Sequence, residues 1–410
     1  MSQNIQILVE TMLRCGGNCS GCALSSIERM TKSDIDWVLF EQKTKSVNEF
    51  LKTKIQKSEI ESVSIFLGQG DHFLMEEADI EQFVKYCSFM VPEEIKHKTV
   101  VLITASAIGK EKTIKKKMDD FFNISLKYDL PFFIQVVFDP KKMNLQDSFK
   151  KTYLNNILYF KEKCGMTELT LNLGDDLIEN MTPLDFHNWL INYNFTHIEM
   201  NWVMNSQTHN MWKNSSKKMF DWLIEILEIN AKDHKYEINF VPFLTRVFKL
   251  KKMENVDLIE KIKKDLVENI YIDNVGNITF GQAGLISNLI PLKQRLTKQN
   301  LNIDNIKQIE EFAQKISQSI VSKVLRKKSC VDCNYNNICS LIGSSAWFDF
   351  NKKEDGCPWD IKDFLIFFEK YLEKYPQYGK TEFDKNPIQD TKLEKENNAT
   401  YQYFEKKFCN

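Results

Sequence analysis

The chain has 410 residues and a formal net charge of −1, from 55 basic and 56 acidic side chains. That balance gives no electrostatic reason to expect nucleic acid as a partner, and no apolar run reaches the roughly 18–20 residues that span a bilayer. The first residues, MSQNIQILVET, lack the features of a secretory signal, so we expect a cytoplasmic protein. In a reducing cytoplasm, clustered cysteines bind metal more often than they form disulfides.

Short apolar runs alternate with longer amphipathic stretches from residue 4 to residue 265. Strands that alternate with helices predict βαβ units and a parallel sheet. Six or more such units favour an α/β fold of the partial (β/α)6-type TIM barrel over an open nucleotide-binding sheet. The predicted strands are 5–10, 63–68, 99–106, 132–139, 169–174, 197–203 and 236–243, and the predicted helices are 74–91, 110–127, 145–164, 182–193 and 215–232.

The pattern changes after the predicted barrel. Residues 269–284 place Asn-Val-Gly-Asn between two β-rich arms, which predicts a hairpin. Helical patterns follow near 303–326 and 360–374, and the end of the chain is polar and charged. We therefore expect three parts, which are a barrel over 1–265, a smaller cluster-binding domain of hairpin and helices over 266–375, and a polar tail over 376–410.

Three cysteines, Cys15, Cys19 and Cys22, follow the first strand in LRCGGNCSGC with the spacing C-x3-C-x2-C. In a barrel this is the carboxyl end of a strand, where active sites are built. Clustered thiolates suit an iron–sulfur cluster or zinc, but both usually take four protein ligands, and no fourth lies nearby. A cubane held by three thiolates would leave one iron open to a ligand. The alternatives are a zinc site with a distant fourth ligand and three chance cysteines.

This loop resembles the signature of the radical S-adenosylmethionine (radical SAM) superfamily. The resemblance implies a [4Fe–4S] cluster whose open iron binds the amino and carboxylate groups of S-adenosyl-L-methionine (SAM). It also implies reductive cleavage of SAM to a 5′-deoxyadenosyl radical, which abstracts hydrogen from a substrate. Family members usually carry an aromatic residue before the third cysteine, where this chain has Gly21, so the packing against the adenine differs.

A second part of the resemblance lies at the end of the second predicted strand. The family has a Gly-Gly-Glu stretch there that receives the SAM ammonium group, and this chain has Gly68, Gln69, Gly70 and Asp71. Glycines allow a ligand to approach the backbone closely, and a carboxylate can accept from a cation. The alternative is an ordinary turn in which Asp71 caps a helix. Other strand ends offer polar contacts for the SAM carboxylate and ribose, namely Ser106, Gln135, Asp139 and Asn172.

A complete four-cysteine set occurs later, with the spacing C-x2-C-x5-C-x17-C, at Cys330, Cys333, Cys339 and Cys357. It resembles the SPASM domain, which normally holds two auxiliary [4Fe–4S] clusters. Because Gln282 and Gly343 stand where the family has cysteines, the resemblance implies one auxiliary cluster. A structural zinc site is the alternative. Cys87 lies in a helix-like stretch and is expected to be an inert core thiol.

The resemblance implies modification or crosslinking of a peptide or protein side chain, assisted by the auxiliary cluster. Two alternatives remain, the same chemistry on a small metabolite and a zinc-stabilised, non-catalytic binding protein. We also expect an electron donor such as flavodoxin or ferredoxin. Since the first strand begins within ten residues of the start, we expect no leader-binding domain on the chain, and a separate leader-binding protein could supply one. The candidate acids and bases are Asp139, Asp175, Asp176, Glu199 and Tyr271.

Overall fold

The computed structural model describes residues 4–12, 14–17, 19, 30, 36–130, 132–164, 168–201, 209–238, 241, 269–272, 278–280, 333–335 and 361–376. The predicted helix at 303–326 and the tail after residue 376 lie outside the described residues. The same holds for four of the seven predicted metal ligands, namely Cys22, Cys330, Cys339 and Cys357.

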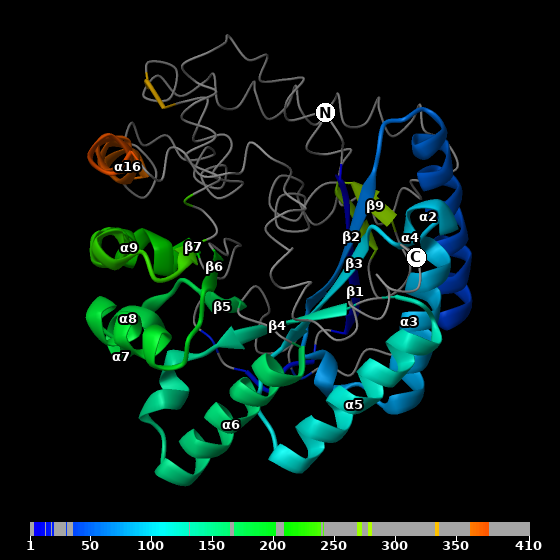
Figure 1. The fold of residues 1–410 in the computed structure, drawn as a ribbon, viewed down its shortest axis with the longest axis horizontal. Coiled ribbons are helices and arrows are strands. Elements are labelled where there is room, and N and C mark those ends of the chain that lie inside the picture. Colours follow the sequence, from blue (N-terminus) through cyan, green and yellow to red (C-terminus); the bar gives the residue numbers. More distant parts are fainter. Residues whose placement is uncertain are drawn as a thin grey trace.

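A curved sheet forms the centre of the described structure, with helices along its outer side (Figure 1). Seven strands run parallel in the spatial order β7-β6-β5-β4-β3-β2-β1, so each strand pairs with the next one along the chain. The sheet of described strands is open, and the predicted α/β partial barrel is confirmed. The strands are β1 (Asn4–Met12), β2 (Ser62–Gln69), β3 (Thr99–Ala105), β4 (Phe132–Phe138), β5 (Glu168–Asn172), β6 (His197–Asn201) and β7 (Glu237–Ile238).

Burial alternates along the strands and so identifies the two faces of the sheet. In β3, every second residue from Thr99 to Ala105 is buried, and the residues between are half-buried. The buried set packs against the helices, and β-branched side chains such as Val101 and Ile103 suit this pleated surface. The half-buried set therefore lies on the inner face, opposite the helices.

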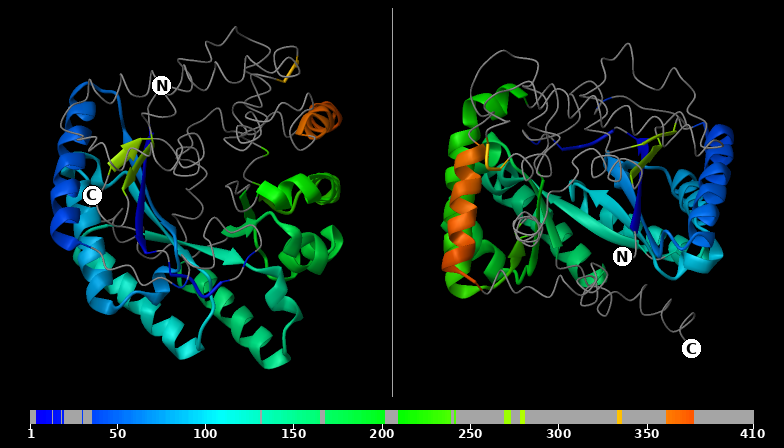
Figure 2. Two further views of the ribbon diagram at one scale, coloured as in Figure 1. Left: turned by 180° about the vertical axis from the view of Figure 1, so that it is seen from behind. Right: turned by 90° about the horizontal axis from the view of Figure 1, so that it is seen from above.

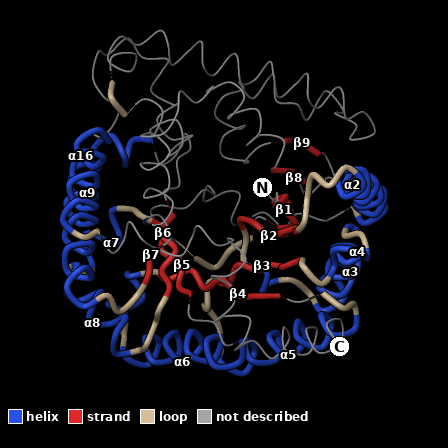
Figure 3. The backbone as a smooth tube through the Cα atoms, turned by 45° about the horizontal axis from the view of Figure 1, so that its top comes forward, coloured by secondary structure: helices blue, strands red, loops and turns tan. Residues whose placement is uncertain are grey.

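The helices cover the outer face in chain order, as the arc in Figure 3 shows. Each crossover carries a helix back to the start of the next strand, which parallel pairing requires. No helix among those described combines the length and apolarity that crossing a bilayer demands. The helices are α2 (Trp37–Gln56), α3 (Glu77–Met90), α4 (Glu93–Lys96), α5 (Glu111–Lys127), α6 (Asp147–Cys164), α7 (Asp175–Asn180), α8 (Pro183–Asn192), α9 (His209–Asp233) and α16 (Ile361–Lys374), with short 3-10 turns η1 (His72–Leu74) and η2 (Pro140–Asn144).

The predicted hairpin is present as β8 (Asn269–Ile272) and β9 (Ile278–Phe280), which pair antiparallel. Strand β8 also pairs parallel with β1, where Leu8 is the register partner of Tyr271. The hairpin thus extends the barrel sheet beyond its first strand. Its sheet neighbour β1 is the strand that precedes the first cysteine loop.

Helix α16 lies along α9 in two views of the molecule (Figure 2). The rings of Phe364 and Phe220 stack with centroids 5.1 Å apart, and the Tyr371 hydroxyl donates to the Leu227 carbonyl at 3.5 Å. The apolar stripe of α16 includes Phe368, which is fully buried. These contacts join the end of the described chain to the barrel helices.

Candidate functional site

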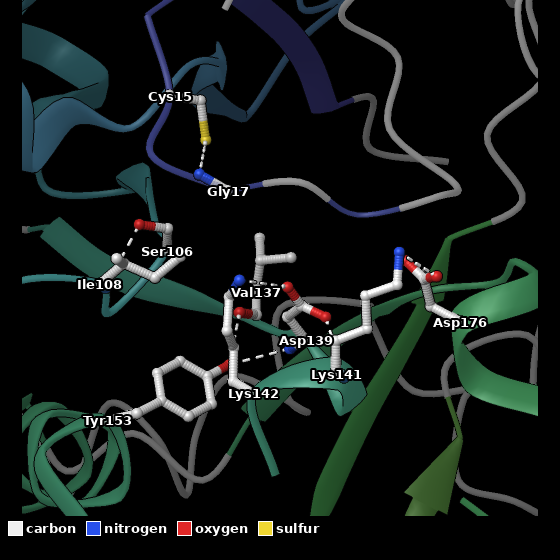
Figure 4. A network of polar contacts seen from close by, with 10 residues as sticks. All are labelled: Cys15, Gly17, Ser106, Ile108, Val137, Asp139, Lys141, Lys142, Tyr153 and Asp176. Carbon is white, nitrogen blue, oxygen red and sulfur yellow. Dashed lines mark hydrogen bonds and ion pairs between the residues drawn. The ribbon is translucent and has the colours of Figure 1, made fainter. Parts of the chain in front are cut away.

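The first cysteine loop begins directly after β1. The Gly17 amide donates to the Cys15 sulfur at 3.2 Å, as Figure 4 shows. A methyl group added at Gly17 would lie 3.3 Å from the Cys15 sulfur and 3.8 Å from the Cys19 sulfur. Two thiols therefore flank a single glycine, whose amide is already directed at one of them. This arrangement fits a soft metal cluster held by thiolates and tuned by backbone hydrogen bonds.

The turn after β2 is tied to that loop. The Asp71 amide donates to the Arg14 carbonyl at 2.9 Å, and Gln69 at the end of β2 is the register partner of Met12. The stretch Gly68–Gly70 therefore lies beside the chain that leads into the cysteines. The sequence placed this stretch at the end of a strand, and the structure puts it next to the loop.

Asp71 is 1% exposed, and both of its carboxylate oxygens accept hydrogen bonds. One oxygen accepts from the Phe73 amide at 3.1 Å, and through this hydrogen bond Asp71 caps η1. The other oxygen accepts from the Ser106 hydroxyl at the end of β3. Burial raises the pKa of Asp71, and these hydrogen bonds partly oppose that rise. Two predicted site residues, Asp71 and Ser106, thus come together, and the capping role that the sequence left open for Asp71 is present.

Gln135 and Asn172 belong to β4 and β5 and are both half-buried. Gln135 lies between the buried residues Ile134 and Val136, and Asn172 lies between buried leucines. Because neighbours along a strand point to opposite faces, both side chains lie on the inner face of the sheet. These two predicted residues share a face, and within the described part of the chain no hydrogen bond joins them to the Asp71–Ser106 pair.

A charged group follows β4 and β5 (Figure 4). Asp139 caps η2 by accepting from the Lys141 amide at 3.1 Å, and its second oxygen lies 3.5 Å from the Lys142 ammonium. The Lys141 ammonium forms an ion pair with Asp176. Asp139 also donates its backbone amide to the Tyr153 hydroxyl at 2.8 Å.

Cys19 lies close enough to this charged group to affect the pKa values of Lys141 and Tyr153. Burial lowers the pKa of Lys141, but Asp176 outweighs that effect and, with smaller contributions from Asp139 and Cys19, raises the pKa above its usual value. Burial also raises the pKa of Tyr153, and the Cys19 charge adds to the rise. The first cysteine loop therefore faces a lysine that is held in its charged form.

Glu199 lies in the middle of β6, on the inner face. One carboxylate oxygen accepts from the hydroxyl of Thr170 at 3.0 Å, and Thr170 is its register partner on β5. Burial raises the pKa of Glu199 to about 7, and the Thr170 hydrogen bond opposes the rise. The fifth candidate acid or base, Tyr271, is placed here only by its register beside Leu8.

Sequence reasoning missed Lys141, Tyr153 and Thr170. Lys141 had a readable signal, because it follows the strand-ending Asp139 in the run Asp-Pro-Lys-Lys. Thr170 and Tyr153 had none, since one is a β-branched strand residue and the other lies within helix α6. Their roles depend on register and on helix packing.

Of the second cysteine set, the structure describes Cys333. The Tyr335 amide donates to the Cys333 sulfur at 3.4 Å, and the Tyr335 hydroxyl donates to Glu369 of α16 at 2.5 Å. Burial, followed by Glu369, raises the pKa of Tyr335 to about 12. Within the described residues no three candidate ligand side chains converge, and both cysteine sets have members outside that part of the chain.

No family model matches the chain. No curated protein matches it either. Solved structures do, among them anSMEcpe with bound AdoMet and the Cp18Cys peptide, at a TM-score of 0.57 and 13% identity over 92% of this chain and 98% of that one. Streptococcus suis SuiB bound to the precursor peptide SuiA matches at a TM-score of 0.52 and 13% identity, over 88% of this chain and 76% of SuiB.

The chain shares the fold of these two proteins, which are radical SAM enzymes. The partial-barrel fold that the resemblance implied is thereby confirmed. In this fold, the Cys15–Cys19 loop and the inner-face residues of β4, β5 and β6 belong to one partial barrel.

Proposed function

We propose that this protein is a radical SAM enzyme that abstracts hydrogen from a side chain of a peptide or protein. The observation that carries the proposal is the pair of sulfurs, Cys15 and Cys19, that flank the Gly17 amide at the carboxyl end of β1. Support comes from the fold, which the chain shares with a protein that holds AdoMet and a peptide.

In this proposal Cys15, Cys19 and Cys22 hold a [4Fe–4S] cluster with one open iron. With SAM bound, such a cluster supplies a 5′-deoxyadenosyl radical by one-electron cleavage. The backbone of Gly68–Gly70 receives the ammonium group of SAM. The carbonyl groups of this stretch, which includes Gln69, and the Asp71 carboxyl group accept from that ammonium. The polar contacts for the SAM carboxylate and ribose come from Ser106, Gln135 and Asn172.

Cys330, Cys333, Cys339 and Cys357 hold one auxiliary [4Fe–4S] cluster in this proposal. With four thiolate ligands it has no open position, so its chemistry is electron transfer or positioning of the substrate. Tyr335 supports that site, because its amide bonds the Cys333 sulfur and its hydroxyl bonds α16. The proposed partners are a reducing donor such as flavodoxin or ferredoxin and a separate leader-binding protein, and the proposed location is the cytoplasm.

A peptide substrate is favoured over a small metabolite because two neighbours in fold were solved with peptides bound. The test is to incubate the reduced enzyme and SAM with short peptides encoded beside its gene, and to follow their masses. A loss of two mass units or an internal crosslink in a peptide supports the proposal. Oxidation of a metabolite in the same cell extract, with every peptide unchanged, would favour the alternative substrate.

Anaerobic reconstitution tests the clusters themselves. The wild type should bind about eight irons per chain and release 5′-deoxyadenosine from SAM under dithionite. Replacing Cys15, Cys19 and Cys22 with Ala should remove about half of the iron and abolish that release. Cys87→Ala is the matched control, because Cys87 is fully buried in α3 and should not affect either readout. Two zinc ions and no iron would identify the zinc-stabilised binding protein instead.

A further inference from the structure

The structure separates the candidate acids and bases by their surroundings. Asp139 lies 3.5 Å from the Lys142 ammonium, and Asp176 is paired with Lys141. Both carboxyl groups are therefore engaged in ion pairs. Asp175 lies in the first turn of α7, beside Asp176.

Glu199 has a different environment. Ile198 and Met200 on either side of it are buried against the helices, so Glu199 lies on the inner face. Its hydrogen-bond partner, Thr170, is neutral. Across the described residues no lysine or arginine contributes to its electrostatics, and burial raises its pKa to about 7. A carboxyl group in this state exchanges a proton readily at neutral pH.

The register places Glu199 close to the proposed SAM contacts. Thr170 and Asn172 are two residues apart on β5, which is roughly 7 Å along a strand, and both belong to the inner face. Asn172 is the residue nearer the carboxyl end of the sheet, the end that carries the cysteine loop. Glu199 thus lies level with Thr170, two residues farther from the carboxyl end of the sheet than Asn172. A substrate side chain that entered the barrel from that end would reach it.

We infer that Glu199 accepts the proton that the substrate loses when it is oxidised. This inference rests on the proposed function. In that oxidation the substrate would lose a hydrogen atom to the 5′-deoxyadenosyl radical that bound SAM would supply, and an electron to the oxidised auxiliary cluster that the second cysteine set would hold. The Glu199 carboxylate accepts the remaining proton. Two electrons and two hydrogens leave the substrate, which gains one double bond or one crosslink. Thr170 is the positioning residue that holds the carboxylate, and its hydrogen bond partly opposes the effect of burial on the proton affinity of Glu199.

Among the described residues, the other ionisable groups near Glu199 come from three strands. Glu168 on β5, His197 on β6 and Glu237 on β7 occupy one row of register partners, two residues nearer the amino ends. His197 lies 3.8 Å from the Glu237 carboxylate and contacts the Thr196 hydroxyl at 2.9 Å. His197 is the histidine of this row, so the variant His197→Gln serves as a control for Glu199→Gln.

The first experiment needs no substrate. Infrared difference spectra of the reconstituted enzyme are recorded between pH 5 and 9, and the carbonyl stretch of protonated carboxyl groups is followed. A band that titrates near pH 7 should be present in the wild type and in His197→Gln, and absent in Glu199→Gln. In Thr170→Val it should titrate at higher pH, because the hydrogen bond that lowers the pKa of Glu199 is gone. A spectrum unchanged by Glu199→Gln would overturn the inference.

The second experiment uses a mixture of synthetic peptides, each with one Ser, Cys or Tyr, as the substrate probe. In the wild type, product formation should rise with pH through about 7, as the carboxylate form accumulates. Glu199→Gln should lower product formation by about 100-fold or more and keep 5′-deoxyadenosine release within about twofold. Glu199→Asp should restore part of the rate, and Thr170→Val should shift the rise to higher pH.

The failures are distinguishable. A wild type that releases no 5′-deoxyadenosine contradicts the proposed function itself. If the wild type releases 5′-deoxyadenosine but leaves every peptide unchanged, the proposed peptide substrate is contradicted. The inferred role of Glu199 is then contradicted as well, because no peptide supplies the proton. Equal product formation by Glu199→Gln and wild type, with the same pH profile, contradicts the inference alone.

Discussion

Asp71 joins three segments of the chain through one buried residue. Its amide bonds the Arg14 carbonyl of the cysteine loop, and its carboxylate bonds the Phe73 amide and the Ser106 hydroxyl. A carboxylate in such a place depends on its donors, because burying it without them would be costly. Ser106 therefore supports the loop that carries the cysteines even though it lies on a different strand.

Replacing Ser106 with Ala should weaken both folding and SAM binding. The Asp71 oxygen would lose its donor while buried, at a cost of about 1–3 kcal/mol in the free energy of unfolding. The turn that we propose to receive the SAM ammonium group would also shift, so we expect a Kd for SAM about tenfold higher. Urea unfolding and equilibrium dialysis of the reconstituted enzyme measure the two effects.

Ser88→Ala is the matched control for Ser106→Ala. Ser88 is also buried, and its hydroxyl makes a 2.8 Å hydrogen bond to the Tyr128 carbonyl, away from the cysteine loop. It should lose about 1 kcal/mol of stability and bind SAM like the wild type. If Ser106→Ala also bound SAM like the wild type, the hydrogen bonds that connect Ser106 through Asp71 to the loop would not contribute to SAM binding.

Lys141 offers a second test at the level of single residues. Its partner Asp176 is buried, so Lys141→Gln should leave a buried carboxylate uncompensated and cost about 1–3 kcal/mol. The exposed pair Lys217–Asp221 has the same chemistry, and Lys217→Gln should cost less than about 0.5 kcal/mol. Thermal unfolding measures both. The double variant Lys141→Gln with Asp176→Asn should recover part of the loss, and no recovery would mean that the two residues are not coupled.

At the scale of elements, the strands were predictable from the sequence because each is a short apolar run bounded by polar residues. The first six predicted strands agree with β1–β6 to within two residues at each end. Helix α2 was not predicted. Its buried stripe repeats at helical spacing but includes Thr44 and Lys54, which a hydrophobic pattern counts as polar. Lys54 is buried because its ammonium group reaches the Glu59 carboxylate at 2.5 Å.

Helix α16 links Cys333, the described member of the second cysteine set, to the barrel helices through Tyr335. Its fully buried Phe368 should cost about 3–5 kcal/mol when replaced with Ala. Phe367 is half-buried one position earlier, so Phe367→Ala is the matched control and should cost less. Because Glu369 on the same helix holds Tyr335 beside Cys333, we expect Phe368→Ala to lose the iron of the proposed auxiliary cluster and Phe367→Ala to retain it. Urea unfolding and iron analysis after desalting report the two effects, and full iron retention by Phe368→Ala would contradict the link.

At the scale of the whole molecule, the sheet combines local and distant pairings. The order β1 to β7 follows the chain, and sequence alone anticipates it because parallel βαβ units place successive strands side by side. The pairing of β8 with β1 joins residues more than 250 positions apart, and no local pattern specifies its register. The candidate site divides in the same way. The cysteine loop and the Gly68–Asp71 turn were readable as motifs, but the Glu199–Thr170 pair required the register.

Two groups whose pKa values are shifted, the buried His72 and the half-buried Glu199, should affect stability as a function of pH with opposite signs. Burial lowers the pKa of His72 to about 4, so between about pH 4 and 6.5 only the unfolded chain binds that proton, and stability rises with pH. Burial raises the pKa of Glu199 to about 7, so between about pH 4.5 and 7 only the folded chain keeps that proton, and stability falls with pH. Each slope is at most about 1.4 kcal/mol per pH unit. The two contributions therefore oppose each other across most of this range.

The variant Glu199→Gln should separate the two contributions. It removes the contribution of Glu199, which falls with pH, and keeps the contribution of His72, which rises with pH. The melting temperature of the variant minus that of the wild type should therefore increase steadily from pH 4.5 to 7 and then level off. Thermal unfolding at half-unit pH steps measures this difference, and Glu225→Gln, an exposed change on α9, should follow the wild type throughout. A difference between Glu199→Gln and wild type that stayed constant with pH would mean that Glu199 carries no extra proton in the folded state. It would also remove the proton affinity on which the inferred role of Glu199 depends.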